Sequence, residues 1–239
     1  AIRDLALELA QPTRLIFLGD LIDRGPRNLG VLRLWAEPAA ARGVGRIDRV
    51  MGNHEQILLL AMGQGPHAER ATTAWLTDKT GGKAVLAEMV RAANTADARP
   101  SARLFQEALG GDVWRHFTAM ESHVAIGNTV FVHGGLDPRV PAATCLAQPW
   151  ESFTDARWAW VHGEFLQWQD GFGGTLVVHG HTPPRLHREL TGQEDPHLFA
   201  FDRLGLDGGT TGTGIVTAAQ IETGRYRILR ASLRAPVIA

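Results

Sequence analysis

Residues 16–25 read Ile-Phe-Leu-Gly-Asp-Leu-Ile-Asp-Arg-Gly, so two carboxylates and an arginine directly follow a short apolar run. The run "RLIFLG" at residues 14–19 ends in glycine and is continuous rather than alternating, which is typical of a strand buried on both faces. Pro26 and Asn28 then lead into "LGVLRLWAE", which we expect to be a helix. A buried strand, a polar turn and a helix in this order favour an α/β fold.

Similar strand ends recur further along the chain. Residues 45–55, "GRIDRVMGNHE", predict a brief strand, a Gly-Asn turn and the start of a helix. Residues 122–135, "SHVAIGNTVFVHGG", predict a hairpin that turns at Gly127-Asn128, and residues 174–182, "GTLVVHGHT", predict another buried strand. Because ligands of open α/β sheets bind beyond the carboxyl ends of the strands, we expect the polar residues there to converge on one crevice.

Length and composition bound the class of protein. The 239 residues, 44% of them hydrophobic, can bury a large core, and we expect one domain over residues 1–239. The formal net charge of -1 argues against a nucleic-acid partner, since such proteins usually carry a basic excess. Cys145 is the single cysteine and can form no internal disulfide, which suits a reducing compartment. We expect it to be a structural thiol. No apolar run reaches the roughly 18 residues that span a bilayer and no signal peptide opens the chain, so we expect no membrane partner and a cytoplasmic location.

The remaining segments are mostly helical, apart from a strand-rich C-terminal third. Residues 1–10 have apolar side chains at helical spacing, and residues 63–120 read as a helical insertion within the domain. Near the C-terminus, Glu222-Thr223-Gly224 predicts a hairpin turn. The segment at residues 157–168 predicts a helix with one aromatic and aliphatic face that packs into the core, formed by Trp158, Val161, Phe165 and Trp168.

The polar residues after the strands are oxygen and nitrogen donors. Carboxylate, amide carbonyl and imidazole together suit Mn, Fe or Zn, and the lack of thiolate disfavours a structural zinc. Each motif alone is more often an ordinary turn, but four of them after four strands indicate a shared metal site. Arg24 adds a planar, permanently charged group that suits phosphate oxygens. The candidate residues are Asp20, Asp23, Asn53, His54, His133, His179 and His181.

These motifs resemble those of the calcineurin-like metallophosphoesterases, and within them the bacterial phosphoprotein phosphatase-like family. The resemblance covers about residues 10–230 and implies a four-layer αββα sandwich with two mixed β-sheets. As a set the motifs are specific for the superfamily and say less about the substrate. They are Gly19-Asp20-Leu21-Ile22-Asp23-Arg24-Gly25, Gly52-Asn53-His54-Glu55, His133-Gly134-Gly135 and Gly180-His181-Thr182.

The resemblance implies a metal-ligand role for four residues. Asp20 matches the carboxylate that bridges two metal ions in the family, which are expected to be Mn, with Fe or Zn as alternatives. The remaining ligands of the second metal are matched by Asn53, His133 and His181. His179 has no clear counterpart, and we expect it to pack beside the ligands rather than to bind metal.

Three further residues match the family's catalytic groups. His54 matches the general acid, Asp23 the carboxylate that orients it, and Arg24 an arginine that binds phosphate. A carboxylate beside a histidine fixes the imidazole tautomer and favours its protonated form. One positioned acid supplies about 10²–10⁴ in rate, far less than the roughly 10²¹ needed for phosphate monoesters, so metals must contribute as well. The implied mechanism is attack by metal-bound hydroxide while His54 protonates the departing oxygen.

The chain departs from the family pattern at two places. It contains no match to the opening strand and Gly-Asp-x-His-Gly motif that complete the first metal site. We expect two metal ions if such a segment precedes Ala1; without it, the first site would have only Asp20 and would bind weakly or not at all, leaving one metal. Bacterial relatives often carry a phosphate-binding arginine in a segment resembling "WIRxxFL", where this chain has "WVHGEFL" with His162. We expect His162 or the nearby Arg157 to contact the substrate in its place.

Three functions remain open at this stage. The first is hydrolysis of phosphoserine or phosphothreonine in a phosphorylated protein, or of a small phosphoester. The second is hydrolysis of dinucleoside polyphosphates such as diadenosine tetraphosphate, for which residues 63–120 could form or block a groove for the base. The third is a phosphate- or protein-binding pseudo-phosphatase that lacks the first metal site.

Overall fold

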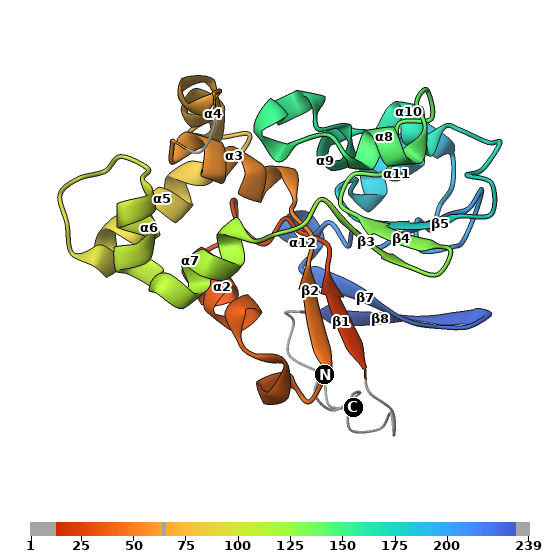
Figure 1. Cartoon of the computed structure of the whole chain (residues 1–239), viewed down its shortest axis with the longest axis horizontal. Coiled ribbons are helices and arrows are strands. Elements are labelled where there is room, and N and C mark those ends of the chain that lie inside the picture. Colours follow the sequence, from red (N-terminus) through yellow and green to blue (C-terminus); the bar gives the residue numbers. More distant parts are fainter. Residues whose placement is uncertain (1–12, 64–65, 233–239) are drawn as a thin grey trace.

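The structure is a computed structural model that describes residues 13–63 and 66–232 (Figure 1). It is an α/β protein in which helices α5, α6 and α7 lie to one side of β1 and β2, and α8, α10 and α11 lie above β3–β5 (Figure 1). The expected helix at residues 1–10 falls outside the described residues. The strands are β1 (Arg14–Phe17), β2 (Arg46–Arg49), β3 (His123–Ile126), β4 (Thr129–Val132), β5 (Leu176–His179), β6 (Arg203–Gly205), β7 (Ile215–Glu222) and β8 (Arg225–Ser232).

Helices of at most twelve residues connect these strands in the described part of the chain. Those that precede β3 are α2 (Asn28–Ala36), α3 (Asn53–Ala61), α4 (Ala68–Trp75), α5 (Gly82–Ala93), α6 (Ala102–Leu109) and α7 (Gly111–Thr118). Those that follow β4 are α8 (Ala142–Leu146), α9 (Arg157–Trp160), α10 (Gly163–Leu166), α11 (Pro184–Thr191) and α12 (Thr210–Thr213). Two 3₁₀ turns lie at Ala39–Arg42 and Trp150–Asp155.

Only one of the hydrogen-bonded sheets in the described residues is mixed, whereas two mixed sheets were expected. The order β3-β4-β5-β6 combines an antiparallel β3–β4 pair with parallel β4–β5 and β5–β6 pairs. Strands β1 and β2 form a separate parallel pair, and β7 and β8 a separate antiparallel hairpin. The four-layer arrangement therefore stays a prediction, while the α/β class and the mixed sheet are observed.

Most predicted strands and turns are confirmed. The β3–β4 hairpin turns at Gly127-Asn128, and the β7–β8 hairpin turns directly after Glu222. Strand β1 differs from expectation because all four of its residues are half-buried rather than buried on both faces. Within the described residues β1 pairs only with β2, and its side chains line an open cleft, which explains this exposure.

The predicted helix at residues 157–168 is instead two short helices, α9 and α10. The backbone is extended at Val161 and irregular at His162, so the helix ends there and restarts at Gly163. His162, at this break, lines the cleft. Three residues of the predicted apolar face are buried, but Trp168 is 37% exposed.

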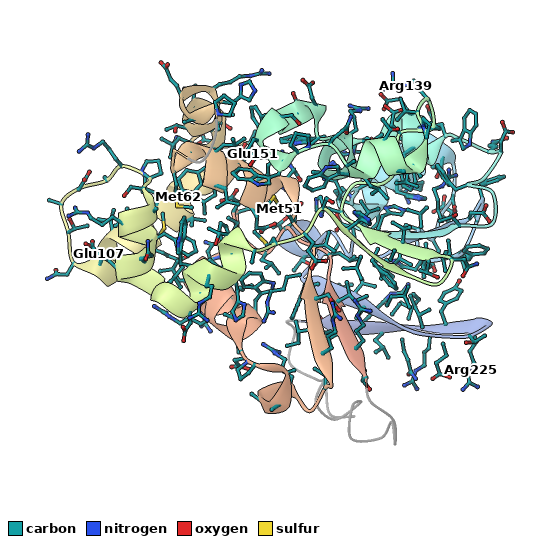
Figure 2. All side chains as sticks on the ribbon, in the orientation of Figure 1. Met51, Met62, Glu107, Arg139, Glu151 and Arg225 are labelled. Carbon is teal, nitrogen blue, oxygen red and sulfur yellow. The ribbon has the colours of Figure 1, made fainter. Side chains whose placement is uncertain are left out.

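The core surrounds α3, whose nine residues are all buried. Helix α4 packs against α3, and α5 packs against α6, so the predicted helical segment after residue 63 shares this core. Met51 and Met62, labelled in Figure 2, lie at the two ends of the α3 segment and are both buried. Cys145 is buried and free, as expected of a structural thiol. None of the helices in residues 13–63 and 66–232 has the length and apolar character needed to cross a membrane.

Candidate metal centre and active site

Two loops meet where β1 and β2 end, and glycine allows their close contact. A Cβ on Gly19 would lie 2.3 Å from the backbone N of Gly52, and Gly19 has a φ of +86°. A Cβ on Gly52 would lie 2.4 Å from a side-chain oxygen of Asp20. Only glycine fits such an approach without displacing the backbone. The two motifs "GD" and "GNH" are therefore pressed together, which places Asp20 beside the first turn of α3.

The four predicted metal ligands meet at one point. His133 Nε2 lies 3.1 Å from Asn53 Oδ1, 3.1 Å from His181 Nδ1 and 3.2 Å from Asp20 Oδ1. Ligand atoms of Asp20, His133 and His181 all lie within 4.8 Å of one another. Residues 33 to 161 positions apart in sequence are thus brought within the span of one coordination sphere, as the sequence motifs predicted.

The chemistry of this donor set fits a cation. His133 Nδ1 lies 2.6 Å from the carbonyl oxygen of Leu18, which fixes the Nδ1–H tautomer and leaves the Nε2 lone pair facing the cluster. The amide oxygen of Asn53, the carboxylate of Asp20 and the second imidazole are acceptors as well. These donor atoms converge on one point, where a divalent cation could bind in place of a shared proton.

The charge of Asp20 within the cluster also favours a cation at this point. Burial lowers the pKa of His133, but the Asp20 carboxylate outweighs this effect and raises the pKa to about 9. Desolvation raises the pKa of Asp20, but the surrounding imidazoles of His133 and His54 hold it well below its ordinary value. Burial and the neighbouring His133 lower the pKa of His181 well below its ordinary value, so this imidazole keeps a free lone pair. Without a metal, Asp20 therefore stays ionised and His133 keeps a proton, and a bound cation would take the place of that proton beside Asp20.

Glu55 supports the loop that carries Asp20, a role that the sequence motifs did not assign. This fully buried carboxylate accepts hydrogen bonds from the backbone N–H groups of Asp20 and Leu21, both at 2.7 Å, and of Gly52 at 3.0 Å. Burial raises the pKa of Glu55, while the Leu21 N–H lowers it. A glycine followed three residues later by glutamate at a helix start was a sequence signal for such a capping contact.

The predicted acid, its orienting carboxylate and the arginine are in direct contact. His54 Nδ1 lies 2.6 Å from Asp23 Oδ2, and His54 Nε2 lies 2.7 Å from Arg24 Nη2. Burial lowers the pKa of His54, but the charges of Asp20 and Asp23 outweigh it, so the pKa is raised. Burial raises the pKa of Asp23 above its ordinary value, although hydrogen bonds with His54 and Trp75 offset part of this rise. His54 and Asp23 are buried and Arg24 is exposed to the cleft, which places the pair behind the arginine.

Unusual backbone conformations gather at this site. Asp20, Asp23, Arg24 and His181 have positive φ angles of 55°, 73°, 58° and 65°. Each such residue costs about 1–3 kcal/mol and persists only where the surrounding structure enforces it. Half of the eight non-glycine residues with positive φ in the described chain are therefore predicted site residues, which is typical of a functional site.

His162 reaches the cleft and Arg157 does not. The His162 ring stacks on His181 with centroids 4.0 Å apart, and its Nδ1 lies 3.1 Å from Thr182 Oγ1. Burial lowers the pKa of His162, so the ring is neutral. Arg157 Nη2 donates to Glu164 at 2.8 Å, and Arg157 is absent from the described residues that line the cleft.

His179 lies apart from the ligand cluster, as expected. It is 1% exposed and packs edge-on against Phe165 with centroids 4.9 Å apart. Burial lowers its pKa to about 3. Asp207, which sequence reasoning did not single out, lines the same cleft as Asp20, and burial raises its pKa.

Comparison with known proteins assigns the family. The sequence pattern described as calcineurin-like phosphoesterase matches residues 1–208. The chain therefore belongs to the calcineurin-like phosphoesterase family. No curated protein matches the sequence.

Two solved structures are similar to the chain at low sequence identity. A cold-active protein-tyrosine phosphatase of a psychrophile, Shewanella sp., is similar with a TM-score of 0.53 and 16% identity, over 92% of this chain and 69% of that one. A putative diadenosine tetraphosphatase is similar with a TM-score of 0.47 and 20% identity, over 97% of this chain and 87% of that one.

Proposed function

We propose that the protein is a metal-dependent phosphomonoesterase, and that phosphoserine or phosphothreonine in proteins is its favoured substrate. The observation that carries the proposal is the convergence of the Asp20, Asn53, His133 and His181 donor atoms beside the His54–Asp23 pair. Family membership supports hydrolysis of a phosphoester bond. Manganese is the metal we favour, since the donor set combines imidazole with hard oxygen ligands.

Divalent cations held by these four residues would neutralise phosphate charge and lower the pKa of water for attack on phosphorus. Arg24 would hold the non-bridging phosphate oxygens through its planar guanidinium. In the structure this guanidinium donates to His54 Nε2, so its movement onto phosphate would free that nitrogen to carry a proton. His54 would then give the proton to the departing oxygen as the P–O bond breaks, while the oxygen of the attacking water forms the new P–O bond.

Asp23 would keep His54 ready for this step. Its Oδ2 accepts from His54 Nδ1, which orients the ring and stabilises the imidazolium before proton transfer. His162 would contribute a neutral hydrogen-bonding edge at the cleft wall rather than a cation. Arg157 has no part in the proposed site because its guanidinium is engaged with Glu164.

A nucleotide polyphosphate is the second candidate substrate, because basic side chains other than Arg24 also line the cleft. Arg24, Arg27, Arg70 and Lys79 all line it, and the last two come from α4 and the turn after it. Such a row of cations would suit a chain of phosphates.

The test compares three substrates with the same manganese-loaded protein. We expect hydrolysis of p-nitrophenyl phosphate, and faster turnover of a phosphoserine peptide than of diadenosine tetraphosphate. The reverse order would favour the second candidate. Retained phosphate affinity and bound metal without any turnover would indicate a binding protein, and would overturn the proposal.

A further inference from the structure

Trp75 makes a direct contact with the proposed acid–carboxylate pair from a distant part of the chain. It is the last residue of α4, it is 0% exposed, and its Nε1–H donates to Asp23 Oδ1 at 3.0 Å. The other carboxylate oxygen, Oδ2, faces His54 Nδ1 at 2.6 Å. Indole, carboxylate and imidazole thus form one hydrogen-bonded chain of buried side chains that ends at the cleft.

The indole N–H determines the hydrogen-bonding role and the orientation of the Asp23 carboxylate. An indole N–H can only donate, so Asp23 Oδ1 must accept from it. This contact prevents the carboxylate from rotating and directs Oδ2 at His54. The Nδ1–H tautomer of His54 is then the one that can bond to Asp23, which leaves Nε2 as the nitrogen facing the cleft beside Arg24.

The indole itself has little freedom to move. A Cβ on Gly82 would lie 2.4 Å from Trp75 ring atoms, so the first turn of α5 packs against the ring face. Helix α4 also packs against α3, which carries His54 in its first turn. The helical segment predicted from residues 63–120 therefore reaches the centre of the site through a rigid side chain.

We propose that Trp75 is a positioning residue for proton donation by His54, acting through the Asp23 carboxylate. This inference rests on the proposed phosphomonoesterase function. It predicts that removal of the indole N–H slows only the substrates whose leaving group needs a proton. Phenyl phosphate has a poor leaving group, whereas 2,4-dinitrophenyl phosphate releases an anion that departs without protonation.

The experiment measures kcat and KM of the manganese-loaded protein for both esters. Trp75→Phe should lower kcat for phenyl phosphate by about 10- to 100-fold, a part of the roughly 10²–10⁴ that a general acid supplies. Its kcat for the dinitrophenyl ester, its KM values and its metal content should change less than about threefold, because none of these depends on a proton from His54. Trp158→Phe is the matched control, since Trp158 is also buried and donates to a backbone oxygen, that of Gln148, away from Asp23.

A second variant removes the risk that Trp75→Phe misfolds. Incorporation of 3-(3-benzothienyl)alanine at position 75 keeps the bicyclic shape and removes only the N–H donor, and it should show the same leaving-group dependence. In a His54→Ala background, neither change at position 75 should lower kcat further, because a positioning residue acts only through the group it positions.

The outcomes separate this inference from the function on which it rests. If the wild type hydrolyses neither ester, or His54→Ala hydrolyses phenyl phosphate at the wild-type rate, the proposed function fails and the role of Trp75 fails with it. If His54→Ala selectively loses phenyl phosphate turnover but both changes at position 75 leave the ratio of the two esters unaltered, only the role of Trp75 is overturned. An additive loss in the His54→Ala background would also overturn it.

Discussion

Glu55, in the first turn of α3, accepts a hydrogen bond at 2.7 Å from the backbone N–H of Asp20, on the loop after β1. Its second oxygen accepts from the N–H of Leu21 at the same distance. The carboxylate has no access to solvent, so these backbone groups are its direct partners. Helix α3 therefore fixes the backbone of the residue that we propose as a metal ligand.

Glu55→Gln should weaken metal binding although Glu55 is not itself a proposed ligand. The amide NH₂ would face backbone donors, and the loop of Asp20 would shift. Loss of such an outer contact typically costs about 10- to 100-fold in metal affinity. Titration of the metal-free protein with Mn²⁺, followed by calorimetry, measures this change.

Glu88→Gln is the matched control for that variant. Glu88 accepts hydrogen bonds from the N–H groups of Asn28 at 3.0 Å and Leu29 at 2.9 Å, at the start of α2. Both variants should lose stability, by about 1–3 kcal/mol. Equal losses of Mn²⁺ affinity in the two proteins would show that Glu55 has no particular role at the metal centre.

His54→Asn should separate catalysis from metal binding. We expect kcat for phenyl phosphate to fall by about 10²–10⁴ because a general acid is removed. The metal content should stay at the wild-type value, since the His54 ring faces Asp23 and Arg24 rather than the donor cluster. His181→Ala should instead lose metal. Loss of metal from His54→Asn, measured by mass spectrometry, would assign His54 as a ligand and contradict its role as acid.

Arg24→Lys should raise KM more than it lowers kcat. The planar guanidinium can form two parallel bonds to phosphate, and an ammonium cannot. Loss of one charge-assisted hydrogen bond corresponds to about 10- to 100-fold in KM. Inhibition by inorganic phosphate should weaken by the same factor. Arg157→Ala should leave KM unchanged, and a similar rise in both variants would return Arg157 to the substrate site.

The sequence indicated which residues converge more clearly than it indicated how the strands pair. Asp20 and Asn53 each follow a short strand and a glycine, and His133 directly follows β4; strand ends in α/β folds place side chains at one edge. Their convergence on His181 is therefore a consequence of topology that local patterns can reveal. The pairing of β1, β2 and the C-terminal hairpin depends on distant backbone contacts, for which no local pattern exists.

Two other features could not be read from the sequence for the same reason. Trp75 lies 52 positions from its hydrogen-bond partner Asp23, and nothing near it distinguishes it from a core tryptophan. The break between α9 and α10 interrupts a sequence with good helical periodicity, and His162 at the break contacts Thr182 twenty residues away. Tertiary contacts override local preference at both positions.

Arg157 shows how a plausible substrate residue can have a structural role. It belongs to a group of charges with Asp137, Arg139 and Glu164 on the outer side of the molecule (Arg139 is labelled in Figure 2). Arg139 donates two hydrogen bonds to the Asp137 carboxylate, at 2.8 and 2.6 Å. The Arg139 contact lowers the pKa of Asp137 from its ordinary 3.8 to about 2.

Asp137→Asn should therefore destabilise the protein at neutral pH and much less in acid. A carboxylate with a lowered pKa stabilises the folded state fully above its unfolded pKa of 3.8, and this contribution is lost as the pH falls through about 2. The Asp137 side chain is 6% exposed but that of Arg139 is 62% exposed, so solvent screening limits the effect to about 1–2 kcal/mol at pH 7. About half of that difference should remain at pH 3, as measured by urea unfolding of both proteins.

Asp78→Asn, at a fully exposed pair with Lys83, is the control and should show no such dependence on pH. A loss of stability in Asp137→Asn that does not change with pH would mean that packing rather than charge is responsible.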